Sequence, residues 1–331
     1  MKGAVLLTGA AGFIGSHTAE ALLTRGTAVV GIDNFDPFYP AALKRANLAA
    51  VEATAKRTGS RFVLIEGDLA EPGTWDRAAA AARQSNTDGS VSAIHLAARA
   101  GVRPSIDDPV TWAHVNVVGT AVALEAARRH GLARMVIASS SSVYGNCPTA
   151  PFHEELDVSR PISPYAATKR ACELIAYTHH ALHGTPVAML RFFTVFGPRQ
   201  RPDLAINLFM RKIAAGQPIP VFGDMATSRD YTFVGDTVSG ILAALERIDR
   251  HGYRIWNLGH DHPVRLDEMI AAIGRAVGRE PVLDRQPPRQ GDVERTWADL
   301  TRSRAELGYD PKVSFDDGLA AQWAWMQQSG R

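Results

Sequence analysis

Short apolar runs alternate with amphipathic stretches through the first part of the chain. Six runs have the length and composition of buried strands, and they lie at Ala4–Thr8, Ala28–Asp33, Phe62–Glu66, Ala93–Ala97, Met135–Ser139 and Val187–Phe192. Helical patterns stand between them, at Ser16–Thr24, Trp75–Arg83, Val115–Arg129 and Pro164–His183. Strands that alternate with helices at this spacing form βαβ units. The pattern therefore predicts an α/β fold with a doubly wound parallel sheet covered by helices on both faces.

The pattern changes after about Gly197, where Gly, Pro and charged residues become frequent and a strand-like piece, Tyr253–Leu258, interrupts the helices. The chain has 331 residues, more than one hydrophobic core usually serves. We predict a first domain over residues 1–196, to which a segment near 233–258 returns. A smaller C-terminal α/β domain over 197–331 is expected to close over it as a lid.

Composition and charge argue against several classes of protein. The chain is 46% hydrophobic and 21% charged, which is ordinary for a soluble enzyme. Its net charge is +2 and it has no basic run, so no nucleic-acid partner is expected. No apolar run approaches the roughly 18–20 residues that span a bilayer, so no membrane partner is expected. Because Cys147 and Cys172 lack metal-ligand spacing, we predict no metal and a reducing, cytoplasmic location.

A glycine-rich segment joins the first strand to the first helix, and it reads Thr8-Gly9-Ala10-Ala11-Gly12-Phe13-Ile14-Gly15. Glycines at this spacing allow a tight turn and a close approach of the backbone to a pyrophosphate, while the helix N-terminus offers N–H groups to the phosphates. Asp33 ends the second strand about 20 residues further on, where a ribose hydroxyl is expected. A carboxylate there would repel the 2′-phosphate of NADP. The predicted cofactor is therefore NAD, bound by a Rossmann-type sheet.

Asp68 follows the third strand, in Glu66-Gly67-Asp68-Leu69. From this position its carboxylate can either reach the adenine of the cofactor or cap the next helix. The sequence leaves both interpretations open.

Three motifs in this order carry a resemblance to a known family: Gly9-x-x-Gly12-x-x-Gly15, His95-Leu96-Ala97-Ala98 and Tyr165-x-x-x-Lys169. Over nearly the whole chain they resemble the extended short-chain dehydrogenase/reductase family, the NAD-dependent epimerases and dehydratases. The cofactor-binding residues that we expect are Gly9, Gly12, Phe13, Ile14, Gly15, Asp33, Asn34, Asp68, Leu69, Leu96, Ala97, Ala98, Tyr165 and Lys169. His95 is interpreted as a core residue near the cofactor rather than as a base.

The resemblance implies catalysis by Tyr165, Lys169 and Ser140. Tyr165 and Lys169 share one helix face, and the ammonium and the positive nicotinamide ring both favour the phenolate. Tyr165 can then take a hydroxyl proton while a hydride leaves the same carbon for NAD. Ser140, three residues before Val143 in a run of four serines, is expected to bond the reacting oxygen. The alternative for this run is a loop that caps itself.

The resemblance also implies a nucleotide-sugar substrate. Sugar-nucleotide 4,6-dehydratases carry an acidic pair in the loop where this chain has Ser140-Ser141-Ser142, so elimination would lack its proton shuttles. Asp33-Asn34-Phe35, Ala100-Gly101-Val102-Arg103 and the stretch from Arg191 to Asp203 resemble UDP-glucuronate 4-epimerases. The substrate-binding residues implied are Arg103, Ser141, Ser142, Thr194, Arg201, Asn207, Arg229, Arg289 and Asp292. Neutral hydroxyls at Ser141, Ser142 and Thr194 suit an enzyme that must hold a uronate carboxylate without releasing CO₂.

Other functions remain open at this point. A UDP-glucose/UDP-galactose 4-epimerase would share every catalytic residue. A UDP-glucuronate decarboxylase is disfavoured because Ser142 stands where that enzyme has Glu. A nucleotide-binding regulator without catalysis would be expected to have lost part of the Ser140, Tyr165 and Lys169 set, which is complete here. The family further implies a homodimer formed through a helix pair that includes Pro164–His183.

Overall fold

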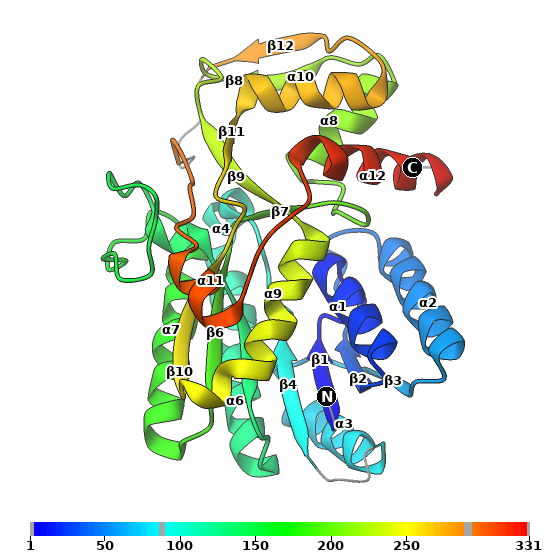
Figure 1. The fold of residues 1–331 in the computed structure, drawn as a ribbon, viewed down its shortest axis with the longest axis vertical. Helices are drawn as coiled ribbons and strands as arrows, with labels where there is room; N and C mark the ends of the chain where they lie inside the picture. Colours follow the sequence, from blue (N-terminus) through cyan, green and yellow to red (C-terminus); the bar gives the residue numbers. More distant parts are fainter. Residues whose placement is uncertain (1–2, 86–89, 288–292, 330–331) are drawn as a thin grey trace.

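The computed structural model describes residues 3–85, 90–287 and 293–329. A seven-stranded sheet with the order β10-β6-β5-β4-β1-β2-β3 forms its larger part (Figure 1). The strands are β1 (Ala4–Thr8), β2 (Ala28–Asp33), β3 (Phe62–Glu66), β4 (Val91–His95), β5 (Met135–Ser140), β6 (Val187–Phe192) and β10 (Tyr253–Leu258). Every neighbouring pair is parallel. The predicted α/β fold class with a Rossmann-type sheet is confirmed.

Helices cover both faces of this sheet, so its strands are buried on both sides. They are α1 (Phe13–Thr24), α2 (Ala41–Thr58), α3 (Pro72–Gln84), α6 (Gly119–His130), α7 (Pro164–His183) and α9 (Val234–Arg247). Because successive residues of a strand point to opposite faces, Leu7 belongs to one core cluster, shared with α1 and α9. Its neighbour Leu6 belongs to the other, shared with α3, α6 and α7.

Several elements differ in their bounds from the sequence-based expectation, among them β4 and α6. β4 ends at His95 rather than Ala97. The reason is that Leu96 and Ala97 leave the sheet, where Gly9 packs directly against the Ala97 backbone. The helix expected from Val115 is preceded by α4 (Val102–Asp107), α5 (Pro109–Trp112) and a π-helical turn at Ala113–Val118. In this turn the buried Asn116 side chain bonds both the N–H and the carbonyl of Arg99.

A smaller body lies beyond the carboxyl ends of the large sheet (Figure 1). It contains the sheet of β7 (Thr194–Phe196), β9 (Ser228–Phe233) and β11 (Pro263–Arg265), the pair β8 (Ile219–Phe222) and β12 (Leu283–Gln286), and helices α8 (Ala205–Ala214), α10 (Leu266–Val277) and α12 (Phe315–Gln328). This body has its own apolar cluster, which includes Phe196, Ile213, Ile219, Met269 and Leu319.

The chain returns to the large sheet after entering the smaller body. β10 pairs with β6, and α9 packs on the first core cluster. Leu307 and Tyr309, at and just after the end of α11 (Thr301–Leu307), belong to the same cluster. Among the described helices, none combines the length and apolar character needed to cross a membrane.

A fully buried ion pair fastens α7 to the sheet. Glu173 is 0% exposed and Arg191 of β6 is 1% exposed. Arg191 Nε and Nη2 donate to the two carboxylate oxygens of Glu173 at 2.8 and 3.0 Å, and Ser139 Oγ donates to Glu173 Oε1 at 2.7 Å. Burial alone would raise the pKa of Glu173, but the hydrogen bonds and charge of Arg191 hold this pKa below its ordinary value. The pair is therefore ionised in the folded protein.

Replacement of Glu173 by Gln should destabilise the fold strongly, because it leaves the Arg191 charge uncompensated in the interior. We expect the free energy of unfolding, measured by urea denaturation, to fall by roughly 3–5 kcal/mol. Glu246→Gln is the matched control, since the Glu246–Arg25 pair is 46% exposed on both sides and its loss should cost less than about 1 kcal/mol. Equal losses in the two variants would mean that the buried pair contributes no more to stability than the exposed one.

Candidate active site

A cavity of about 380 Å³ lies at the carboxyl ends of the parallel strands. Its wall includes the segments that follow β1, β2, β3, β4 and β6, the last residues of β2 and β5, and part of α7 (Pro164–His183). Open parallel sheets bind their ligands at this edge, where the strand order reverses between β1 and β4. Arg201 and Leu204 complete the wall from the side of the smaller body.

The glycine turn after β1 forms the floor of this cavity. Gly9 has a φ of 70°, and its N–H donates to Ile32 O at 2.8 Å. A Cβ on Gly15 would lie 1.9 Å from Gly9 O, so any side chain there would force the turn apart. Among the described residues no side chain caps α1 at Gly12. The first N–H groups of the helix thus remain for an anionic group, as a dinucleotide phosphate requires.

Asp33 stands at the end of β2 with 7% of its surface exposed, and it lines the cavity. Its carboxylate accepts hydrogen bonds from Ala11 N at 3.1 Å and Phe35 N at 2.9 Å, and Lys44 Nζ lies 3.7 Å away. A carboxylate has about four acceptor positions, so capacity remains for a ribose hydroxyl. The backbone bonds fix the orientation of the carboxylate toward the turn.

Asp68 also lines the cavity. It accepts a hydrogen bond from Asn34 Nδ2 at 3.0 Å and one from Ala70 N at 2.8 Å. α3 begins at Pro72, and Glu71 occupies its N-cap position. Asp68 therefore forms part of the cavity wall and does not cap α3, while its contact with the adenine stays a prediction.

Ser140, Tyr165 and Lys169 come together on the wall of the same cavity. Ser163 caps α7 by accepting from Ala166 N at 3.2 Å, which places Tyr165 in the first turn and Lys169 one turn later. Lys169 is 4% exposed, and its Nζ donates to Ala138 O at 2.8 Å. Two of its three ammonium protons remain for other acceptors.

Ser140 caps the turn that follows it, as one interpretation of the serine run predicts, and it also lines the cavity. Its Oγ accepts a hydrogen bond from Ser142 N at 3.1 Å and so caps the 3₁₀ turn at Ser141–Tyr144. A hydroxyl has one proton to donate in addition to its acceptor positions. That proton is left for a reacting oxygen in the cavity.

His95 lies beneath this wall and is 3% exposed. Hydrogen bonds join its Nδ1 to Thr8 Oγ1 at 2.8 Å and its Nε2 to Thr120 Oγ1 at 3.3 Å. Burial, with a smaller contribution from the Lys169 charge, lowers the pKa of His95 to about 3. It is thus a neutral core residue that holds β1 and β4 together, in agreement with its interpretation from the sequence.

The expected substrate-binding residues are distributed more widely. Thr194 and Arg201 line the cavity, whereas Ser141 is 8% exposed and, like Ser142, lies in the 3₁₀ turn after Ser140. Arg103 on α4 stacks over Phe222 at 5.5 Å, and Arg229 Nη1 donates to Ser228 O at 2.8 Å in β9.

Asn207, like Ser141, Ser142, Arg103 and Arg229, is not among the residues that line the cavity. Asn207 is 5% exposed in α8, where its Nδ2 donates to Gln200 O at 2.8 Å and its Oδ1 accepts from Arg211 Nε at 3.0 Å. Its polar atoms thus serve the packing of α8. Arg289 and Asp292 lie outside the described residues.

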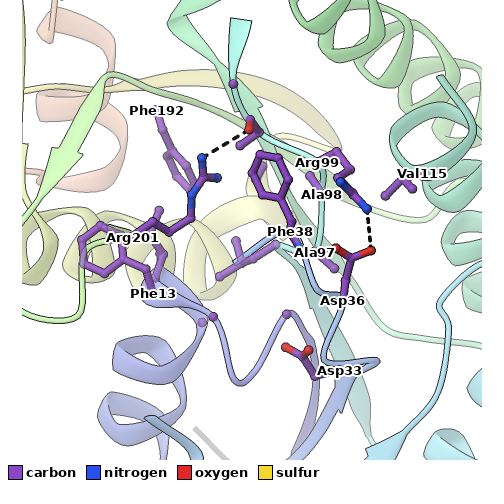
Figure 2. A pocket seen from close by; sticks show the side chains of 18 of the residues that line it. Phe13, Asp33, Asp36, Phe38, Ala97, Ala98, Arg99, Val115, Phe192 and Arg201 are labelled. Carbon is purple, nitrogen blue, oxygen red and sulfur yellow. Dashed lines mark hydrogen bonds and ion pairs between the residues drawn. The ribbon is translucent and has the colours of Figure 1, made fainter. Parts of the chain in front are cut away.

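Among the residues of the wall that sequence reasoning missed are Asp36, Phe38, Tyr39, Lys44 and Arg99. Figure 2 shows Phe38 between Arg99 and Arg201, with Asp36 paired to Arg99. An aromatic pair in a loop after a strand gives little signal alone. The opposite charges of Asp36 and Arg99 stand 63 residues apart, so only the fold brings them together.

Comparison with known proteins agrees with this site. The chain belongs to the family described as GDP-mannose 4,6 dehydratase, whose model matches residues 6–322, and the resemblance to NAD-dependent epimerases and dehydratases is thereby confirmed. A UDP-glucuronate 4-epimerase of Thermodesulfobacterium geofontis is 37% identical over 330 residues, which cover 99% of this chain and 97% of that protein.

Solved structures extend the likeness to the fold. The UDP-glucuronic acid 4-epimerase of Bacillus cereus, in complex with UDP-glucuronic acid and NAD, is 34% identical with a TM-score of 0.89, covering 99% of this chain and 100% of that one. The UDP-glucose 4-epimerase of Thermotoga maritima, with UDP-glucose, is 27% identical with a TM-score of 0.85, covering 99% of both chains.

The buried neutral state of His95 makes stability depend on pH. The ordinary pKa of a histidine is 6.5 and the folded pKa here is about 3. As pH falls through this window the unfolded chain binds a proton that the folded protein does not, so the folded state loses stability. When the pH falls from about 7 to about 5, the free energy of unfolding should decrease by roughly 2 kcal/mol less in His95→Gln than in the unsubstituted protein.

The measurement is urea denaturation at the two pH values. His114→Gln, at an exposed position, is the control and should keep the full dependence on pH. If His95→Gln loses as much stability on acidification as the control, His95 does not contribute the linked proton.

Proposed function

We propose that this chain is an NAD-dependent UDP-glucuronate 4-epimerase, which interconverts UDP-glucuronate and UDP-galacturonate. One observation carries the proposal above all others. Ser140, Tyr165, Lys169 and Thr194 line a single cavity together with the glycine turn that suits a dinucleotide. The names of full-length relatives that are 34–37% identical support the same substrate.

The residues present fit NAD. The turn leaves no room for a Cβ at Gly15, free helix N–H groups face a phosphate position, and Asp33 keeps acceptor capacity for a ribose hydroxyl. When bound, NAD supplies the hydride acceptor for C4 of the sugar and, in the return step, the hydride donor. Asp33, Asn34 and Asp68 would hold the adenosine end, and Lys169 the nicotinamide ribose.

The chain's own residues move the proton at the C4 oxygen. Tyr165, as a phenolate, accepts the hydroxyl proton when the 4-keto sugar forms and returns it when the hydroxyl is restored. Lys169 stabilises the phenolate with a proton that its bond to Ala138 O leaves free. Ser140 donates a hydrogen bond to the same sugar oxygen and keeps its proton. Rotation of the 4-keto sugar between the two steps exposes its opposite face and so inverts C4.

The neutral hydroxyl groups near this position would prevent a side reaction of the substrate, the loss of CO₂. Oxidation at C4 of a uronate makes a β-keto acid, which loses CO₂ when its carboxylate turns out of the ring plane. Thr194 on the cavity wall, with Ser141 and Ser142 in the adjoining turn, would hold the carboxylate by hydrogen bonds. The run offers no carboxylic acid as a proton donor for elimination, which disfavours a dehydratase despite the family's name.

The test of the proposed function is product analysis by NMR after incubation with UDP-glucuronate, and in parallel with UDP-glucose. The proposal predicts UDP-galacturonate from the first substrate without release of CO₂. Turnover of UDP-glucose alone would contradict the uronate assignment while keeping the mechanism. Release of CO₂ with a pentose product would indicate a decarboxylase instead.

Thr194→Ala should weaken binding of the carboxylate of UDP-glucuronate. Loss of one hydrogen bond to a charged group corresponds to roughly 1.5–3 kcal/mol, which is about a 10- to 100-fold rise in KM or a matching rise in CO₂ release per turnover. Thr178→Ala, on an exposed position of α7, is the control. Unchanged KM and no CO₂ from the Thr194 variant would remove Thr194 from the site.

A homodimer formed through α6 and α7 is part of the proposal. Leu174, Tyr177 and Leu182 of α7 are 52%, 56% and 72% exposed, and Val118 before α6 is 43% exposed. Apolar surface of this kind marks interaction sites. A solution mass equal to one 35.7 kDa chain would contradict the dimer. Both cysteines are free, in keeping with a proposed cytoplasmic location.

A further inference from the structure

Four side chains from three distant segments meet on the wall of the cavity, and we call them the strap: Asp36, Phe38, Arg99 and Arg201. Asp36 and Phe38 belong to the loop between β2 and α2. Arg99 follows β4, and Arg201 follows β7 on the side of the smaller body. The strap therefore joins the two sides of the cofactor cleft (Figure 2).

In the strap, two arginine side chains lie against one aromatic ring, that of Phe38. Arg99 Nη2 pairs with Asp36 Oδ2 at 2.8 Å. The guanidinium carbons of Arg99 and Arg201 each lie 5.0 Å from the centre of the Phe38 ring. Asp203 pairs with Arg201 at 2.6 Å, so both cations that contact the ring carry a carboxylate partner. A cation above an aromatic ring is attracted by the partial negative charge of the ring face.

One end of the strap is rigid. Asn116 bonds the backbone of Arg99 on both sides, with Arg99 N donating to Oδ1 at 2.8 Å and Nδ2 donating to Arg99 O at 3.0 Å. The buried Trp112 packs edge-on against Phe38, with ring centres 5.7 Å apart. Arg99 is thus held in a fixed position, where Asp36 and Phe38 of the loop after β2 contact it.

The other end depends on these contacts for its shape. The loop from Asn34 to Pro40 has no helix or strand, and Phe35 takes a φ of 51°, which non-glycine residues adopt at a cost. Within the loop, Asp36 N donates to Asn34 Oδ1 and Phe38 N donates to Asp36 Oδ1. The Asp36–Arg99 pair is partly exposed, with 27% and 21% of the side chains accessible, so it can separate and re-form.

We propose that the strap closes over bound NAD and slows its release, so that one dinucleotide serves many turnovers. This inference rests on the NAD-binding part of the proposed function. Epimerisation returns the hydride to the sugar and consumes no NAD. Loss of the dinucleotide between the two hydride transfers would leave an oxidised sugar without a reductant, so retention is a requirement of the chemistry. A closure built from weak contacts still allows the cofactor to load.

The experiment measures the release rate of radiolabelled NAD from the full-length protein after dilution into excess unlabelled NAD. Phe38→Ala should raise the release rate tenfold or more, and Asp36→Asn and Arg99→Gln each by several-fold. The double variant Asp36→Asn/Arg99→Gln should release NAD no faster than the faster single variant, because both substitutions remove one shared pair. Asp267→Asn, which removes a surface pair with Arg265, is the matched control.

Release rates in all strap variants equal to that of the control would overturn the strap and leave the proposed function intact. Failure of the unsubstituted protein to bind labelled NAD would contradict the proposed function as well. Circular dichroism and thermal unfolding show whether each variant folds. If Phe38→Ala does not fold, the two polar substitutions carry the test, since Asn has the size and shape of Asp and Gln keeps a polar side chain at position 99.

Discussion

Glu173 of α7 and Arg191 of β6 meet in the interior, where neither charge reaches water and each holds the other in place. The position of the catalytic helix follows from this contact. Lys169 lies one turn before Glu173 and bonds Ala138 O of β5, and Tyr165 lies one turn before Lys169. Ser139 also donates to Glu173, which fixes the end of β5 immediately before Ser140. One buried ion pair thus sets the relative placement of all three proposed catalytic residues.

The cavity combines a rigid floor with an adjustable side. Its floor is the turn at Gly9–Gly15, where Gly15 has no room for a side chain and the start of α1 is presented to the cavity. Its side consists of the loop after β2, whose shape depends on ion pairs and ring contacts. This division suits a cofactor that stays bound while a substrate exchanges. The floor defines where the dinucleotide lies, and the side governs how readily it leaves.

Local patterns in the sequence were sufficient to predict much of the fold, and the proposed catalytic residues that they suggested line one cavity. The apolar runs at β1, β2, β3 and β6 have the predicted bounds, and the inner strands β1, β2 and β6 are apolar because helices cover the sheet on both faces. The glycine turn and the Tyr165/Lys169 spacing are short-range motifs, and residues of both line the cavity.

Features that depend on tertiary contact could not be predicted in this way. The Asp36–Arg99 pair, the π-helical turn at Ala113–Val118 and the Glu173–Arg191 pair join segments that carry no shared local pattern. Asn207 was suggested by resemblance alone, and in the structure its side chain bonds Gln200 O and Arg211 Nε. Family position alone does not say what surrounds a side chain.

In the proposed mechanism the hydrogen at C4 leaves the sugar as a hydride, is held within the protein and returns to the same carbon. UDP-glucuronate labelled with deuterium at C4 tests this most directly, with the UDP-galacturonate product examined by NMR and mass spectrometry. A retained hydride predicts that the product keeps its deuterium at C4 and takes up none from the solvent. Loss of the label to water would contradict the mechanism, because exchange would mean that C4 is inverted through a proton rather than a retained hydride.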